Sequence, residues 1–425
     1  MIKIAVCGFG TVGKSFVNHV LKYQDKISKN CCKDISISLI ADRSIDKKKF
    51  DSDQIKFSKD ILSVLDSDCD LIIELIGGTD IAYKLAKGAI DKRKSIITAN
   101  KALIAEKGDE LFDLSRKNKT YVGYEAAVAG AIPIINSLMH NMRNERISSI
   151  SGIINGTCNY ILEQMSSEGK SFDESLRSAQ MLGYAEADPT FDIGGFDAAH
   201  KISILSMIAY GIKSPFNDMH IEGIESIESM DIDYANELGY KIKHIATTQL
   251  RDSKIECKVH PALINNKNIL SKIDGVMNAV KTIGDKFGVS LLYGHGAGGD
   301  ATASAVVSNI MDYSIHLDQK EMRKHDCNEN KIMDINDISN QYYLRMYAYD
   351  APGVMAEITA TLANHKISIE AVTQHEPLKN EKLIPIVMIT NTIKYSAIKS
   401  AIEKIESMDN INGSINIIRV FNDNE

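Results

Sequence analysis

The sequence lacks long apolar runs, and its positive charge is nowhere concentrated. No stretch approaches about 18 consecutive apolar residues, and Met1 leads directly into a short strand-like segment rather than into a signal peptide. No Lys/Arg block is longer than Lys47-Lys48-Lys49, and the formal net charge is -7, whereas nucleic-acid-binding surfaces are basic. These absences predict a cytoplasmic protein that binds neither membranes nor nucleic acids.

The spacing of the cysteines does not indicate a metal site. The seven cysteines include no CxxC pair and no Cys/His spacing typical of a metal site, so we expect reduced thiols. The composition, with 44% hydrophobic and 25% charged residues, is that of an ordinary folded protein. A chain of 425 residues is too long for one core, because domains usually contain about 100–200 residues. We expect three domains.

The order of apolar and polar segments predicts what these domains are. Residues 1–135 alternate short apolar runs with helical patterns, which predicts an α/β fold with a Rossmann-type, doubly wound parallel sheet. The mixture of strand-like and helical patterns in residues 136–300 predicts an α+β domain. We expect the helix over 301–317 to return to the first domain. Residues 318–340 are polar and predict a linker. In residues 341–425 the expected order β-α-β-β-α-β is ferredoxin-like.

The first expected strand runs directly into a glycine-rich loop that opens a helix. In a GxGxxG loop the first glycine permits a tight turn, the second lets the backbone approach a pyrophosphate, and the third lets the helix pack on the strand. The helix N-terminus then faces the anion. This context predicts a dinucleotide cofactor. The loop residues are Gly8, Phe9, Gly10, Thr11, Val12 and Gly13.

The second expected strand ends at Asp42 and Arg43, where a dinucleotide fold reads the adenine ribose. Asp42 would accept a hydrogen bond from the 2′-hydroxyl of NAD, whereas Arg43 would pair with the 2′-phosphate of NADP. Asp42 lies farther from Gly13 than is usual, which indicates an insertion around residues 24–33. The two side chains favour different cofactors. We expect NADP(H) to be preferred, with NAD(H) as the alternative.

Two further segments follow strands of the same sheet, at 77–79 and 98–101. Ligands of open α/β sheets bind outside the carboxyl ends of the strands. We therefore expect both segments to border the nicotinamide half of the cofactor. The candidate residues are Gly77, Thr79, Thr98 and Lys101.

An acidic cluster lies farther along the chain, in a segment that Pro189 and paired glycines interrupt. We expect this segment to form a binding loop. Asp197 and Lys201 share one face of the helix that follows, and the apolar residues after Lys201 indicate that this helix is buried. A buried lysine needs a charged partner, which the acidic cluster supplies. The acidic residues are Glu186, Asp188, Asp192 and Asp197.

This combination suits an amino-acid substrate whose hydroxyl group is oxidised. Glu186 and an aspartate would hold the ammonium group. Hydride transfer to NAD(P) requires the alcohol proton to leave, and a buried lysine with a lowered pKa can accept it. Lys101 and Lys201 are both candidates for this role, and the sequence does not choose between them.

Several motifs occur together and in a fixed order over residues 1–317. They are the glycine loop, Asn100-Lys101, and the segments Glu125–Pro133, Asn155–Leu162 and Leu182–Lys201. In this combination the chain resembles homoserine dehydrogenase. The resemblance implies the reversible NAD(P)-dependent interconversion of L-homoserine and L-aspartate 4-semialdehyde, in threonine and methionine biosynthesis. It also implies a substrate-binding and dimerisation role for residues 136–300, within a homo-dimer or homo-tetramer.

The resemblance assigns roles to individual residues. Lys101 and Lys201 match the family's catalytic lysines, and Glu186 and Asp197 match its homoserine ligands. Gly298 matches a returning glycine loop that touches the cofactor. The same motifs contribute three further expected substrate residues, which are Asp192, Gly156 and Thr157.

A monovalent cation, often sodium, is also implied by the resemblance. Main-chain carbonyl and carboxylate oxygens are suitable ligands for a hard cation. Without the resemblance, the segment would be interpreted as a strand-to-helix turn. The expected cation residues are Glu125, Val128, Gly130 and Ile132.

The segment Asp350–Ile358, with Gln374 after it, resembles an ACT domain. Pro352 and Gly353 end the first expected strand of this domain in a tight turn, and the helix beyond offers free N–H groups to a small carboxylate. The resemblance implies feedback inhibition by L-threonine. The expected effector residues are Asp350, Gly353, Val354 and Gln374.

Two other functions remain open. An aspartate-semialdehyde dehydrogenase would require a nucleophilic cysteine, for which Cys158 is the one tempting candidate. A non-catalytic NAD(P)-bound amino-acid sensor can be built from the same domains. The sensor would have no need for a proton acceptor near the nicotinamide, which argues against it.

Overall fold

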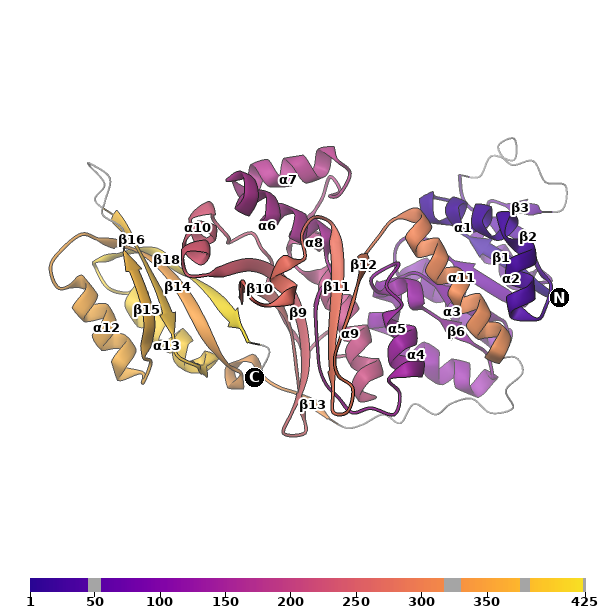
Figure 1. The fold of residues 1–425 in the computed structure, drawn as a ribbon. Helices are drawn as coiled ribbons and strands as arrows, with labels where there is room; N and C mark the ends of the chain where they lie inside the picture. Colours follow the sequence, from indigo (N-terminus) through magenta and orange to yellow (C-terminus); the bar gives the residue numbers. More distant parts are fainter. Residues whose placement is uncertain (45–54, 317–329, 375–382, 423–425) are drawn as a thin grey trace. The chain divides into compact units, whose positions relative to one another are not determined.

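The computed structural model divides the chain into two compact units (Figure 1). Unit 1 consists of residues 1–150, 200–217 and 278–329, and unit 2 consists of residues 151–199, 218–277 and 330–425. The structure describes residues 1–44, 55–316, 330–374 and 383–422. The lysine block at 47–49 and residues 318–329 of the predicted linker therefore lie outside the described residues.

Unit 1 is built on a six-stranded sheet with the order β3-β2-β1-β4-β5-β6. All neighbouring strands in it are parallel. Because parallel strands need crossover connections, helices cover both faces, which gives the doubly wound arrangement predicted from the sequence. The strands are β1 (Ile2–Cys7), β2 (Ile35–Ala41), β3 (Lys56–Ser58), β4 (Leu71–Glu74), β5 (Ser95–Thr98) and β6 (Val122–Gly123).

Two hydrophobic cores sandwich this sheet. On one face Phe16 and Val20 of α1 pack with Ile310 of α11, and Figure 1 shows α11 in orange beside the indigo α1. On the other face Leu85 of α3 packs with Leu103 of α4. The helices are α1 (Thr11–Lys22), α2 (Gln24–Cys31), α3 (Asp80–Asp91), α4 (Lys101–Asn118) and α11 (Gly299–His316).

The unusual distance between Gly13 and Asp42 has a structural explanation. Residues between α1 and β2 form the extra helix α2, whose Ile27 and Cys31 are buried in the same core as α1. Cys32 ends this helix in the left-handed conformation, with φ 52°. The insertion is thus a packed element, and it leaves the end of β2 next to β1 as in shorter dinucleotide folds.

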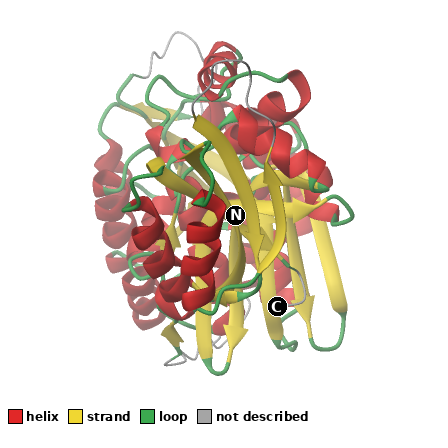
Figure 2. Cartoon of the chain, turned by 90° about the vertical axis from the view of Figure 1, so that its left-hand side faces the viewer, coloured by secondary structure: helices red, strands yellow, loops and turns green. Residues whose placement is uncertain are grey.

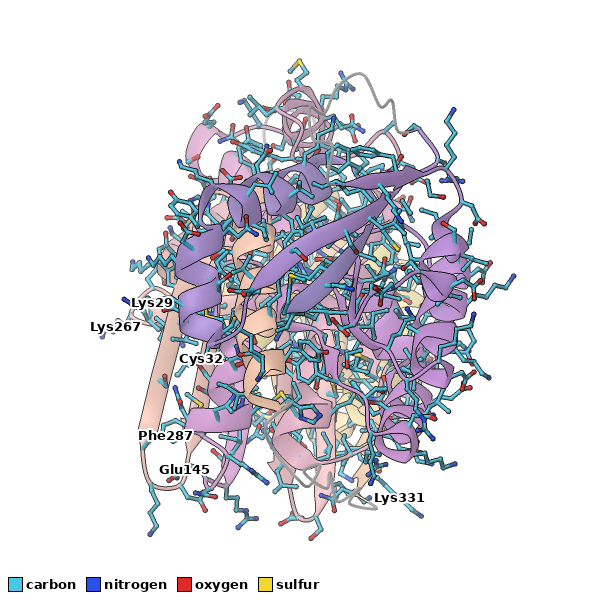
Figure 3. The ribbon with its side chains drawn as sticks, turned by 90° about the vertical axis from the view of Figure 1, so that its right-hand side faces the viewer. Lys29, Cys32, Glu145, Lys267, Phe287 and Lys331 are labelled. Carbon is cyan, nitrogen blue, oxygen red and sulfur yellow. The ribbon has the colours of Figure 1, made fainter. Side chains whose placement is uncertain are left out.

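The rest of unit 1 contains short helical turns and a hairpin formed by β11 and β12. Ser148 on β7 donates from its hydroxyl group to the carbonyl of Ile283 on β11 (3.0 Å). At the tip of the hairpin the Lys286 amide donates to the Glu145 carboxylate (3.1 Å), near Phe287 (Figure 3). The elements are η3 (Glu125–Ala127), α5 (Ile134–Asn136), η4 (Ser137–Asn141), β7 (Ile147–Ile153), β11 (Met277–Gly284) and β12 (Gly288–His295). Of these, β7 and β11 cross the boundary into unit 2.

Unit 2 contains strands in the order β9-β10-β18-β14-β16-β15. Numbered by their order along the chain, the last four strands have the 4-1-3-2 arrangement of a ferredoxin-like fold. Their elements follow one another as β-α-β-β-α-β, as predicted. The strands are β9 (Tyr240–Arg251), β10 (Lys254–Asn265), β14 (Ser339–Tyr349), β15 (Ile369–Gln374), β16 (Leu383–Thr390) and β18 (Ile411–Phe421), with small additions at β8 (His220–Ile221), β13 (Lys331–Ile332) and β17 (Ile393–Lys394).

The two faces of β14 are covered differently because successive side chains of a strand point in opposite directions. Leu344 and Met346 pack against α12 (Val354–Asn364) and α13 (Tyr395–Glu406). Figure 2 shows the helices in red and the strands in yellow, viewed from this end of the chain. On the other face Tyr343 joins a core with residues of α6, α8 and α10. The remaining helices of unit 2 are α6 (Gly156–Glu168), α7 (Phe172–Met181), α8 (Thr190–Ile193) and α10 (Ser229–Glu237).

Helix α9 (Phe196–Tyr210) begins in unit 2 and continues into unit 1. Ala198, Ile202 and Leu205 are all buried, so this helix has the apolar surroundings predicted for it. Among the described helices, none is long and apolar enough to cross a bilayer.

Candidate active site

The glycine loop of unit 1 has the geometry that each of its glycines was expected to provide. Gly8 has a φ of +97°, and a Cβ on it would lie 2.4 Å from the Leu75 carbonyl oxygen. A Cβ on Gly13 would lie 2.1 Å from the Gly8 carbonyl oxygen, so only glycine lets α1 pack this closely. By contrast, a Cβ on Gly10 would meet no atom within 4 Å, which leaves its backbone open to a ligand. Thr11 and Val12 follow as the first two residues of α1.

Asp42 turns back onto this loop from the end of β2. Its Oδ2 accepts a hydrogen bond from the Phe9 backbone N–H (2.7 Å), and its Oδ1 accepts from the backbone and side chain of Ser44 (2.8 Å each). Burial alone would raise the pKa of Asp42, but these hydrogen bonds outweigh it and lower the pKa. Both oxygens are therefore engaged within the protein, whereas the neighbouring Arg43 is exposed.

The returning loop that contains Gly298 lies in the same unit. Gly298 has a φ of +119° with open space around its Cα. The next residue, Gly299, starts α11, and a Cβ there would lie 2.8 Å from Ser15 Oγ and 3.2 Å from Thr11 Cγ2. The two glycine-rich loops thus meet at the N-terminus of α1. The structure brings together Gly298 and the residues of the first loop, as a shared cofactor site requires.

The carboxyl ends of β4 and β5 are joined by a buried hydrogen-bond network that the sequence did not reveal. Glu74 is fully buried and accepts from Thr98 Oγ1 and from the Ile76 backbone N–H. Thr98 Oγ1 in turn accepts from the Asn100 N–H (2.9 Å), and Asn100 Nδ2 donates to the Gly78 carbonyl (2.8 Å). This network fixes the two loops expected beside the nicotinamide.

Lys101 is the first residue of α4 and directly follows this network. Asn100 caps the helix by accepting from the Leu103 N–H (3.1 Å), and Lys101 itself is half-buried. The second candidate lysine, Lys201, is buried in α9 with 8% of its surface exposed. In the same helix the ring of His200 stacks on Phe216, with ring centroids 4.2 Å apart.

In unit 2 one amide group joins two of the predicted acidic residues. Asn155 Nδ2 donates to Asp192 Oδ1 (2.8 Å) and to Asp197 Oδ2 (2.9 Å). Asn155 Oδ1 accepts from the Cys158 N–H (2.8 Å) and so caps α6. Asp197 is only 2% exposed. The Asn155-Gly156-Thr157 motif was visible in the sequence, but the bridging role of Asn155 was not.

The other expected substrate residues lie in different surroundings. Glu186 is exposed, and its backbone carbonyl accepts from Gln180 Nε2 (3.1 Å). Thr157 donates from Oγ1 to the Tyr184 carbonyl (2.6 Å), and a Cβ on Gly156 would lie 2.8 Å from the Val276 carbonyl oxygen. Gly156 and Thr157 thus shape the start of α6.

Cys158 does not have the surroundings of a nucleophile. Its side chain is fully buried, and its thiol donates to the Asp192 carbonyl oxygen (3.2 Å). A reactive thiol needs access to substrate and a setting that stabilises the thiolate. The structure therefore gives no support to a thioester mechanism through Cys158.

The expected cation segment is buried, and its carboxylate has other partners. Glu125 accepts from the N–H groups of Ile135 (3.2 Å) and Asn136 (2.7 Å). Burial raises the pKa of Glu125 to about 7 although these hydrogen bonds oppose the rise. The backbone oxygens of this segment have the chemistry of hard-cation ligands, so they fit such an ion, whereas the carboxylate serves to hold the following turn. Val128, Gly130 and Ile132 are buried alongside.

The expected effector residues gather at one edge of the C-terminal sheet. Strands β14 and β15 both run antiparallel to β16, so their carboxyl ends point to the same edge. Asp350 follows β14 and Gln374 ends β15, and both side chains are exposed. Gly353, with a φ of +98°, stands immediately before α12, whose first residue Val354 is buried.

We expect Glu74→Gln to flatten the pH dependence of stability. Burial raises the pKa of Glu74 to about 7, from an ordinary value of 4.5. The folded protein therefore holds this proton more tightly than the unfolded chain does, and its free energy of unfolding falls as the pH rises from about 4.5 to about 7. The full difference corresponds to about 3 kcal/mol.

The glutamine oxygen can accept from the Ile76 N–H, its nitrogen can donate to Thr98 Oγ1, and the side chain does not titrate. Urea unfolding of both proteins at about pH 5 and pH 8 measures the change. Glu125 contributes a loss of the same sign in both proteins, so the difference between them isolates Glu74. An identical loss of stability in the variant and the wild type would show that Glu74 is not responsible.

Known proteins share this arrangement along the whole chain. Residues 8–125 match the homoserine dehydrogenase NAD-binding domain, residues 133–311 match the homoserine dehydrogenase family, and residues 342–407 match the ACT domain. The homoserine dehydrogenases of Neisseria gonorrhoeae and Pseudomonas aeruginosa are 42% and 38% identical to it, and each match covers 99% of this chain and 98% of the relative.

Solved structures agree with these matches. A homoserine dehydrogenase from Thiobacillus denitrificans has a TM-score of 0.93 at 38% identity, over 99% of this chain and 98% of that one. A hyperthermophilic archaeal homoserine dehydrogenase in complex with NADPH has a TM-score of 0.64 at 26% identity, over 76% of this chain and 99% of that one. The chain belongs to the homoserine dehydrogenase family, with an NAD(P)-binding domain and a C-terminal ACT domain.

Proposed function

We propose that this protein catalyses the reversible NAD(P)-dependent interconversion of L-homoserine and L-aspartate 4-semialdehyde, in threonine and methionine biosynthesis. The observation that carries the proposal is the Asn155 bridge, because it holds two carboxylates, Asp192 and Asp197, in one place. Paired carboxylates are suited to an ammonium group. The sequence match over 99% of the chain supports the same reaction.

In this proposal the carboxylates bind the substrate and a lysine moves the proton. Asp192, Asp197 and Glu186 hold the amino group of homoserine. The nicotinamide, when bound, accepts the hydride from the carbon that carries the hydroxyl group. Lys201 or Lys101 accepts the hydroxyl proton as the carbonyl forms, and returns it in the reverse direction. Lys201 is buried, at 8% exposure, in the same helix as Asp197.

We propose NADP(H) as the preferred cofactor, with NAD(H) also used. Asp42, the residue that would select NAD, already accepts hydrogen bonds from Phe9 and Ser44. Arg43 is exposed at the same strand end, where a 2′-phosphate would lie. The archaeal relative that was solved with NADPH is consistent with this preference.

The proposal also includes a cation, an effector and an assembly. A sodium ion would be held by main-chain oxygens in the segment 125–132. L-Threonine would bind at the sheet edge that carries Asp350, Gly353, Val354 and Gln374, with its carboxylate toward the N-terminus of α12. The family resemblance supports a homo-dimer or homo-tetramer in the cytoplasm.

We expect Lys201→Met to lower kcat for homoserine oxidation by about a hundredfold or more, because removal of a general base typically costs that much. The rate of NADP⁺ reduction with L-homoserine measures this. Lys213→Met is the matched control, since Lys213 is an exposed lysine just beyond the end of the same helix. Equal losses in both variants would argue against a specific role for Lys201, and absence of wild-type turnover would refute the proposed function.

We expect Arg43→Ala to raise KM for NADPH by about tenfold, because it removes one charge-assisted hydrogen-bonding group from the 2′-phosphate. KM for NADH, which lacks that phosphate, serves as the internal control and should change little. Steady-state assays with both cofactors measure the ratio. A parallel rise in both KM values would place Arg43 outside the phosphate site.

We expect L-threonine to inhibit the wild-type enzyme and Gln374→Ala to raise the half-inhibitory threonine concentration by about tenfold, through loss of a polar contact with a charged ligand. Each protein is compared with its own uninhibited rate over a threonine titration. Lys366→Ala is a suitable control, because Lys366 is exposed in the same domain but precedes β15. Equal inhibition of the wild type and Gln374→Ala would move the effector site elsewhere.

A further inference from the structure

Arg419 is a large, charged side chain that is almost completely buried, at 1% exposure, on the last strand of the ferredoxin-like domain. Its Nη1 donates to Glu222 Oε2 (2.6 Å), and its Nη2 lies 3.3 Å from His220 Nε2. The guanidinium also lies over the ring of Tyr395, 5.0 Å from the centroid. Arg419 thus joins the ferredoxin-like domain to a carboxylate elsewhere in unit 2. Burying a charged side chain is costly, so this contact is a candidate for a specific role.

Both the side chain and the backbone of Glu222 are held by hydrogen bonds. His220 Nε2 lies 2.5 Å from its second carboxylate oxygen. The Glu222 backbone N–H donates to the Val259 carbonyl (2.8 Å), and the Glu222 carbonyl accepts from His244 Nε2 (3.0 Å). Burial alone would raise the pKa of Glu222, but His220 and the charge of Arg419 outweigh it and hold the pKa far below its usual value. Glu222 is therefore a fixed, ionised anchor.

The backbone next to this anchor touches the turn between Asp192 and Asp197 without any side chain in between. A Cβ on Gly223 would lie 2.4 Å from the Ile193 carbonyl oxygen, and the Ile224 N–H donates to that same oxygen (2.9 Å). Gly195 has a φ of +88°, and a Cβ on it would lie 3.1 Å from the Glu222 carbonyl oxygen. Any shift of Glu222 is therefore transmitted directly to residues 193–195.

We propose that Arg419 is a positioning residue for the substrate carboxylates, acting through Glu222 and the 193–195 turn. Asp192 and Asp197 flank this turn, and Asn155 bridges them. The proposal rests on the proposed function, because it takes these carboxylates as substrate ligands. It makes the ferredoxin-like domain a structural part of the substrate site as well as the candidate effector domain.

The domain offers a matched control. Arg345 on β14 is also buried, and it forms a bidentate pair with Asp231 of α10 through distances of 2.7 and 3.2 Å. Like Arg419, it joins the ferredoxin-like domain to the rest of unit 2. Asp231 carries no contact with residues 193–195 in the described hydrogen bonds, so loss of this pair should loosen the domain without moving the substrate carboxylates.

The test compares steady-state kinetics of the full-length wild type, Arg419→Met and Arg345→Met. We expect Arg419→Met to raise KM for homoserine about tenfold, in the usual range for energetic coupling, with KM for NADP⁺ unchanged. Arg345→Met should leave both KM values within about twofold of the wild type, because its site is independent. Arg419→Lys keeps the charge but not the planar pair of donors, so an intermediate KM is expected.

Hydrogen exchange provides a readout that does not depend on turnover. We expect backbone amides of residues 190–197 to exchange about tenfold faster in Arg419→Met, and at the wild-type rate in Arg345→Met. If Arg419→Met fails to fold, the double variant Arg419→Met with Glu222→Met removes both charges of the pair and should still show the faster exchange.

Exchange at the wild-type rate in residues 190–197 of folded Arg419→Met or of the double variant would overturn the proposal. Equal effects of Arg419→Met and Arg345→Met would also overturn it. A wild-type protein that does not oxidise homoserine would instead refute the proposed function, while the exchange measurement would still decide whether Arg419 positions this turn.

Discussion

Two carboxylates of unit 2, those of Asp192 and Asp197, share one amide donor, and the candidate substrate site depends on this interaction. Neighbouring carboxylates repel each other, so they stay together only while donors face them. The amide of Asn155 donates to Asp192 and Asp197 at once, and its own position is fixed because its carbonyl caps α6. Beneath it, Leu162, Ile193 and Ile224 share one apolar core, which fixes the helices that carry the polar groups.

The ferredoxin-like domain is attached to this arrangement through buried charges as well as through apolar packing. Arg345 pairs with Asp231, which also accepts from Tyr343 (2.9 Å), and Arg419 pairs with Glu222. Buried ion pairs add little to net stability, because desolvation offsets their attraction, but they tolerate few alternative geometries. The two pairs therefore specify one orientation of β14 and β18 against the rest of unit 2.

The parts of the site that were predictable are those encoded by neighbouring residues. The glycine loop, Asp42 and the segment from Glu186 to Lys201 could be proposed as candidates because each is a local pattern with a local physical reason. Asn155, Glu74 and Arg419 were not identified, since each acts through partners far away in the sequence. Arg419 and Glu222 are 197 positions apart, and nothing in the pattern around either residue indicates the other. The fold class followed from the alternation of strands and helices, whereas the packed helix at 24–31 was visible only as an unusual spacing.

The hydrogen bond between Asp42 and the Phe9 N–H has a consequence for how tightly a cofactor can bind. A glycine-rich loop is intrinsically mobile, and a ligand that had to immobilise it would lose affinity through the conformational entropy removed on association. Here the loop is tied to the end of β2 by the protein's own carboxylate, at 2.7 Å, as the chain folds. This part of the ordering is in place before any dinucleotide binds, so more of the contact energy with the pyrophosphate is expressed as affinity.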